Sequence, residues 1–179
     1  MVGVGFIMLA CTPKYDWRDV RHDEARWKAT FPGKPVEVSR SLTLPDTNAV
    51  VTLTLRSAKI DNNLFAVGWI ANTAKNTAGH LEAAMLANIA AAPESIRRNV
   101  ITKNGQTLYE LRAKGKMPVA EGGTRHDANL WMRTITFVTP ATGTAPAATH
   151  VIEILALGPS GQLRDTDAEL FIESLTLLQ

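Results

Sequence analysis

His126 and Asp127 adjoin each other in the sequence, and together they could transfer a proton or hold a small ligand. They fall in the stretch 114–128, where two consecutive glycines indicate a loop. Trp131 follows closely and could give a cleft near that loop an aromatic wall. We therefore take His126, Asp127 and Trp131 as candidate ligand-binding residues. The competing interpretation is a solvated loop pair beside a tryptophan of the core.

The remaining residues assemble no recognised catalytic or metal-binding motif. None of the four histidines has a second ligand at a spacing such as His-x-x-x-His. There is no Gly-x-Ser-x-Gly nucleophile elbow, and Gly158-Pro159-Ser160-Gly161 is typical of a turn. We predict no catalytic residue, no metal and no cofactor. An enzyme whose residues meet only in the fold stays open as an alternative.

Cys11 is the only cysteine, and it directly follows ten uncharged, mostly apolar residues. Its sequence neighbours supply no base that would lower the pKa of the thiol. The preceding run, residues 2–10, has neither the helical nor the strand period of a core element. Its length suits the hydrophobic part of a signal peptide and is too short to span a membrane.

Met8-Leu9-Ala10-Cys11 resembles the bacterial lipobox, whose cysteine is acylated and follows the cleavage site. Ala10 has the small side chain expected before the cut, whereas Leu9 is bulkier than usual. No Lys or Arg precedes Cys11, which a leader truncated at its start would explain. The resemblance implies lipid attachment at Cys11. An uncleaved leader and a structural thiol are the alternatives.

The lipobox resemblance also implies a location in the cell and a division of the chain into three segments. Residues 1–11 would form the signal peptide, residues 12–15 a short tether and residues 16–179 a single domain. Stable anchoring needs two or more acyl chains, since one chain binds a membrane only marginally. Thr12 in place of an aspartate is associated with transfer to the outer membrane in Gram-negative lipoproteins. The implied location is the cell envelope, on the periplasmic side of the outer membrane.

Composition narrows the classes of partner. The chain of 179 residues is 45% hydrophobic and carries 19 Lys+Arg against 17 Asp+Glu, which gives a net charge of +2. Acidic residues interrupt the basic ones, whereas nucleic-acid binders gather them into a patch. We therefore predict no nucleic-acid binding. The expected partners are the membrane, through the lipidated N-terminus, and an unidentified envelope protein or small ligand.

Alternation of apolar and polar residues predicts antiparallel strands, the clearest at 27–31, 51–56 and 130–138. Residues 64–70 are apolar on both sides, as in a central strand covered on both faces. Asn104-Gly105 is typical of a two-residue hairpin turn.

Two segments predict helices. Residues 77–92 are rich in alanine, and their large apolar side chains recur every fourth position up to Pro93. Thr166 and Glu169 fit a capping box that would begin a short helix over residues 168–173. The expected fold class is therefore α+β: one domain with a mostly antiparallel β-sheet covered by helices.

Four segments also resemble a group of proteobacterial lipoproteins and membrane proteins with a Mog1/PsbP-like domain: Tyr15-Asp16-Trp17-Arg18, Phe31-Pro32-Gly33-Lys34-Pro35, Phe65-Ala66-Val67-Gly68 and Glu173-Ser174-Leu175. The resemblance implies an α/β/α sandwich and no shared catalytic residues. With the leader, it favours a non-enzymatic envelope lipoprotein that binds or scaffolds another component. A periplasmic domain that binds a small molecule or a lipid is the alternative.

Overall fold

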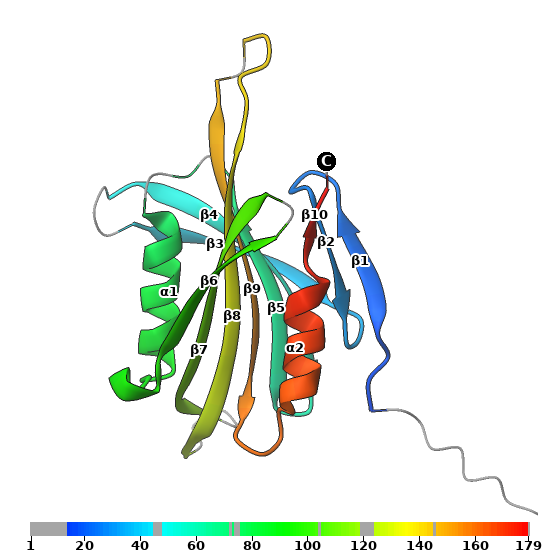
Figure 1. Ribbon diagram of the computed structural model, residues 1–179, viewed down its shortest axis with the longest axis vertical. Helices are drawn as coiled ribbons and strands as arrows, with labels where there is room; N and C mark the ends of the chain where they lie inside the picture. The colour runs from blue at the N-terminus through cyan, green and yellow to red at the C-terminus, as the bar shows by residue number, and fades with distance from the viewer. Residues whose placement is uncertain are drawn as a thin grey trace, which may run out of the picture.

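The computed structural model of the protein contains two antiparallel β-sheets and two short α-helices (Figure 1). It describes residues 14–44, 48–71, 73, 76–103, 105–118, 124–144 and 146–178. Cys11 and the first two residues of the expected tether lie outside these ranges. The larger sheet has seven strands in the order β3-β4-β5-β9-β8-β7-β6, and the smaller sheet has the order β1-β2-β10.

The strands of the large sheet are β3 (Val36–Thr43), β4 (Val50–Ile60), β5 (Asn63–Ile70), β6 (Arg97–Lys103), β7 (Gln106–Pro118), β8 (Arg125–Thr139) and β9 (Ala148–Pro159). Those of the small sheet are β1 (Arg18–His22), β2 (Trp27–Phe31) and β10 (Thr176–Leu177). The helices are α1 (Thr77–Asn88) and α2 (Asp165–Ser174), and a 3-10 turn η1 spans Pro93–Ser95.

The prediction of an α+β sandwich is wrong, because the fold is β-rich. Helix α2 and the small sheet together cover one face of the large sheet, and α1 covers part of the other (Figure 1). Of the stretch 114–128, expected as a loop, residues 114–118 instead extend β7 and residues 125–128 begin β8. The two strands pair from Leu108↔Ile135 to Pro118↔Arg125. Small residues take the inward positions there, so the alternation is weak in the sequence: Ala113 and Ala128 are buried.

Several local predictions are confirmed. Strand β5 lies between β4 and β9, and all of its residues are buried or half-buried, as expected of a central strand. Strands β6 and β7 form a hairpin in which Lys103 pairs with Gln106, and Gly105 has the positive φ of 75° that this tight turn requires. Asn104 itself lies outside the described residues.

The helix ends differ from expectation. Helix α1 ends at Asn88 and not at residue 92. The capping box is wrong, because α2 begins at Asp165 and Thr166 lies inside its first turn. Arg164 precedes the helix, and its Nε lies 2.7 Å from the carboxylate of Asp167. Acidic residues in this first turn interact favourably with the helix dipole.

An aromatic core lies between the large sheet, α2 and the small sheet. Phe171 of α2 contacts Phe31 and Phe65 edge-on, with ring centroids 5.1 Å and 5.3 Å apart. Tyr15, the last residue of the expected tether, is buried here with its ring 6.2 Å from that of Phe65. The packed part of the chain thus includes Tyr15.

Candidate functional site

The structure separates two of the predicted site residues. His126 and Asp127 are consecutive residues of β8, and both are exposed. Consecutive side chains of a strand point to opposite faces of the sheet, so the two do not face a common site. Asp127 shares its face with Trp131, four residues further along the same strand.

Trp131 lines a pocket of its own, of about 480 Å³. The indole is 8% exposed, and the guanidinium carbon of Arg112 lies 3.5 Å from its ring centroid. Arg112 stands directly opposite Trp131 on one side and Arg97 on the other. Lys114 also lines this pocket. The Trp131 pocket is therefore a cation-rich surface hollow at the edge of the large sheet.

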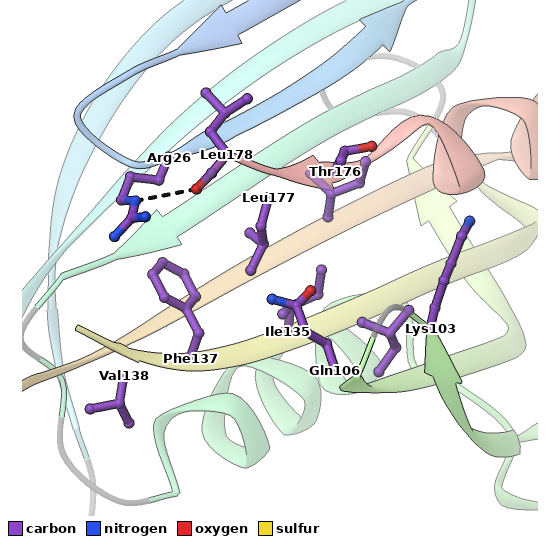
Figure 2. A pocket seen from close by; sticks show the side chains of 11 residues that line it. Arg26, Lys103, Gln106, Ile135, Phe137, Val138, Thr176, Leu177 and Leu178 are labelled. Carbon is purple, nitrogen blue, oxygen red and sulfur yellow. Dashed lines mark hydrogen bonds between the residues drawn. The ribbon is translucent and has the colours of Figure 1, made fainter. Parts of the chain in front are cut away.

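A second cavity lies between the two sheets, at the other end of β8. We call it the Arg26–Lys103 cleft (Figure 2). It has a volume of about 430 Å³ and is lined by Arg26, Lys103, Gln106, Leu108, Ile135, Phe137, Val138, Leu175, Thr176, Leu177 and Leu178. The lining contains two cations and no acidic residue. This is the charge pattern of a site for an anion with an apolar body.

The turn between β1 and β2 holds Arg26 at one end of the cleft. The Ala25 N–H donates to Nδ1 of His22 at 3.0 Å, and the Arg26 N–H donates to the Asp23 carbonyl at 3.1 Å. Arg26 has a φ of 57°, a left-handed conformation that costs a non-glycine residue about 1 kcal/mol. Such local strain is common where the fold positions a functional side chain.

The C-terminal segment closes this side of the cleft through Arg26. The Leu178 N–H donates to the Arg26 carbonyl at 2.7 Å, and Arg26 Nε donates to the Leu178 carbonyl at 3.2 Å. Figure 2 draws the second of these bonds. Among the described residues Arg26 has no ion pair, so the remaining guanidinium nitrogens are open to a ligand.

Lys103 stands at the opposite end of the cleft, and apolar side chains lie between the two cations (Figure 2). Its Nζ lies 2.8 Å from Oε2 of Glu173, and the lysine side chain is 48% exposed. Leu108 and Ile135 are buried in the floor of the cleft. The site thus pairs an apolar floor with a charged rim.

Two further cavities adjoin the cleft through shared residues. One, of about 790 Å³, contains Arg26 and His150, and the other, of about 150 Å³, contains Phe137 and His150. The rings of Phe137 and His150 stack with centroids 5.0 Å apart, and His150 Nε2 lies 3.0 Å from Thr139 Oγ1. Burial, and secondarily the charge of Arg26, lowers the pKa of His150. The imidazole is therefore neutral at pH 7.

Sequence reasoning missed this cleft entirely. Arg26, Lys103 and Leu177 come from three segments far apart in the chain, and no local motif links them. The alternation of Leu175, Thr176 and Leu177 after α2 was the one available signal, since it is typical of a final strand.

Comparison with family models, with curated proteins and with solved structures finds no match to this chain. Within the part of the chain that the structure describes, no three His, Cys, Asp or Glu side chains gather as a metal site would require. Neither described helix is long and apolar enough to cross a membrane.

Proposed function

We propose that this chain is a non-enzymatic lipoprotein of the cell envelope whose domain binds an amphipathic anion. The binding site is the Arg26–Lys103 cleft. The ligand has a carboxylate or another anionic head and a linear apolar body. Two functions expected from the sequence are combined here. One is an envelope lipoprotein that binds another component, and the other is a domain that binds a small molecule or a lipid.

The lining of the cleft carries the proposal. Ligand pockets of about 300–1,000 Å³ are mostly apolar, with a few polar groups that fix the orientation of the ligand. The cleft falls within this range and has cations at both ends of an apolar floor. Of the two cations, Arg26 is the better anchor, because Lys103 is already paired with Glu173 and a guanidinium binds a carboxylate with two parallel hydrogen bonds.

Lauric acid and dodecanol test this site as matched probes, since they share an apolar chain and differ in charge. We expect native mass spectrometry and calorimetry to show laurate bound at least about tenfold more tightly than dodecanol, because a hydrogen bond to a charged group contributes about 1.5–3 kcal/mol. Arg26→Gln should weaken laurate binding most and Lys103→Gln less, because Lys103 is already paired with Glu173, and both variants should leave dodecanol binding unchanged. Equal affinity for the two probes would contradict the proposal.

Lys28→Gln is the control for Lys103→Gln. Lys28 is an exposed lysine of β2 that stands opposite Thr176 of β10, next to the cleft and outside its lining. Its removal changes the net charge as Lys103→Gln does. If both variants weaken laurate binding equally, the effect belongs to overall charge and the cleft is not the site.

The lipid anchor is tested separately. Growth of a Gram-negative host with an alkyne analogue of palmitate should label the wild-type chain and leave Cys11→Ser unlabelled. Equal labelling of both chains would contradict attachment at Cys11 and would leave the cleft proposal standing.

A further inference from the structure

Several turns meet at one end of the molecule, which we call the anchor end because the described chain begins there (Figure 1). Lys14 Nζ lies 3.1 Å from the carboxylate of Asp61, in the turn between β4 and β5. Asn62 of the same turn donates to Gln162 at 3.3 Å. The Ser160 N–H in turn donates to the Asp127 carbonyl at 2.8 Å. These contacts join the start of the described chain to the start of β8.

Basic residues outnumber acidic ones among the described residues of the anchor end. The basic residues are Lys14, Lys34, Lys59, Arg97, Arg112, Lys114, Lys116, Arg125 and Arg164. The acidic residues are Asp16, Asp61, Glu94, Asp127, Asp165 and Asp167. Within the described ranges Lys34, Lys59, Lys114 and Lys116 have no ion pair. The excess charge is therefore free to meet an anionic partner.

The fold offsets only part of the repulsion between these charges, through the stacking of Arg112 on Trp131 and the hydrogen bonds of Arg97 to the Glu94 and Ile96 carbonyls. Arg97 and Arg112 stand directly opposite each other on β6 and β7, and like charges in that position destabilise a strand pair. Lys114 and Lys116 continue the row on the same face of β7, since alternate residues share a face, and Asp127 of β8 stands directly opposite Lys116. Anionic headgroups at the end of this row would reduce the repulsion.

The length of the chain before Lys14 identifies the partner. Three residue steps separate Cys11 from Lys14, and an extended chain spans at most about 3.6 Å per residue. A lipid on Cys11 would hold Lys14 within about 11 Å of the anchored residue. Electrostatic attraction acts over about 8–10 Å at ordinary ionic strength. The cations of the anchor end would then lie within reach of the lipid headgroups.

We infer that the anchor end docks on the phosphate groups of anionic lipid headgroups. The inference rests on the proposed anchor at Cys11 for its orientation, and it adds a second contact between the domain and the bilayer. One consequence is that the Arg26–Lys103 cleft, at the other end of β8, faces away from the membrane and stays open to the periplasm.

Vesicle binding by the full chain carrying Cys11→Ser, which excludes acylation, tests the inference. Co-sedimentation is measured at low salt with vesicles of phosphatidylglycerol and phosphatidylcholine, and with phosphatidylcholine alone. Lys114→Gln/Lys116→Gln in this background should weaken binding to the anionic vesicles about 25-fold, because each lysine near an anionic surface strengthens binding about fivefold. Binding to neutral vesicles should not change.

Lys28→Gln/Arg40→Gln is the matched control, since it removes two exposed cations that lie outside the anchor end. It should leave binding unchanged. Full binding by the Lys114/Lys116 variant, or equal losses in both double variants, would overturn the inference. Inorganic phosphate should release the protein no better than chloride at equal ionic strength. Selective release by phosphate would indicate a discrete phosphate site and would also overturn it.

Discussion

The two faces of the seven-stranded sheet differ in the side chains that they bury and in the layer that covers them. Alternate residues of β9 show this directly: Ile152, Ile154 and Ala156 lie in the aromatic core beneath α2, whereas Val151, Glu153 and Leu155 face α1. Between Val151 and Ala156 the strand thus presents an apolar face to one layer and places a carboxyl group beneath the other. The two layers must differ in what they contribute to stability.

The face beneath α2 is closed by aromatic side chains, and the charge buried there is paired, although the Tyr15 hydroxyl and Trp27 Nε1 have no hydrogen-bond partner among the described residues. Trp27, Phe31, Phe65 and Phe171 are fully buried there. Arg133 is also buried, yet it donates to Glu110 at 2.9 Å, to the Ile172 carbonyl at 3.1 Å and to Glu173. Burial alone would lower the pKa of Arg133, but the hydrogen bonds to Glu173 and Glu110 outweigh it and raise the pKa.

Helix α1 packs less extensively on its face of the sheet than α2 does on the other. Of the residues of α1, only Thr77 and Leu81 are buried. No side chain caps its N-terminus at Asn76, and its first turn has no acidic residue. Glu153 lies under this layer at 7% exposure, between Gly68 and Thr134 of the neighbouring strands, and its Oε2 has no hydrogen-bond partner among the described residues. We infer that stability resides mainly on the α2 face.

The sharpest test of this comparison is a matched pair of truncations, one on each face. Phe171→Ala should lower the free energy of unfolding by about 4–5 kcal/mol, because a large cavity opens in a closed core. Leu81→Ala should cost only about 2 kcal/mol, since the weakly held α1 can shift to fill the gap. Urea unfolding measures both. Equal losses would mean that α1 is as firmly packed as α2.

Arg133→Gln gives the next largest effect, of about 4 kcal/mol, because it leaves Glu110 beside a buried site without its cation and Glu173 with Lys103 alone. Arg98→Gln is the control on the α1 face, where Arg98 pairs with Glu82 at 2.7 Å and is 56% exposed. Exposed pairs contribute about 1 kcal/mol or less. If Arg98→Gln lowers the free energy of unfolding as much as Arg133→Gln does, the inference that stability resides mainly on the α2 face is contradicted.

Local patterns in the sequence predicted local structure well. The apolar run 64–70, the Asn-Gly pair at 104–105 and the first residue of α1 all depend on neighbours in the chain, and all were confirmed. The fold class was missed because the inward positions at the end of β7 and the start of β8 carry small residues, among them Ala113 and Ala128. Gly115 is an example: a side chain there would lie 2.3 Å from the carbonyl oxygen of Ile89, so β7 passes close beneath the end of α1.

The candidate site could not be predicted for a different reason. Arg26 and Lys103 acquire their relation only when the small sheet docks on the large one. Trp131 lines a pocket and also packs in the core, and its role in ligand binding stays a prediction. Its partner Arg112 stands opposite it only through the register of β7 with β8. His126 and Asp127 adjoin in sequence and diverge in space. Adjacency along a strand is thus poor evidence for a shared site.

The third test of the comparison concerns Glu153 and depends on pH. Burial, and secondarily the charge of Glu82, raises the pKa of Glu153 to about 7 from an ordinary value of 4.5. The folded state therefore holds a proton that the unfolded state releases above pH 4.5. Stability should fall as the pH rises from about 4.5 through 7 and level off above it, by about 3 kcal/mol in all. Urea unfolding across this range measures the change.

Glu153→Gln isolates that change, because glutamine keeps the shape of the protonated carboxyl group and cannot ionise. The difference in unfolding free energy between wild type and variant should shift steadily in favour of the variant up to pH 7. Other titrating groups cancel in this difference, among them His150, whose lowered pKa has the opposite effect in the same range. Glu169→Gln, an exposed change on α2, should show no such shift. A difference independent of pH for Glu153→Gln would mean that α1 admits water to the carboxyl group.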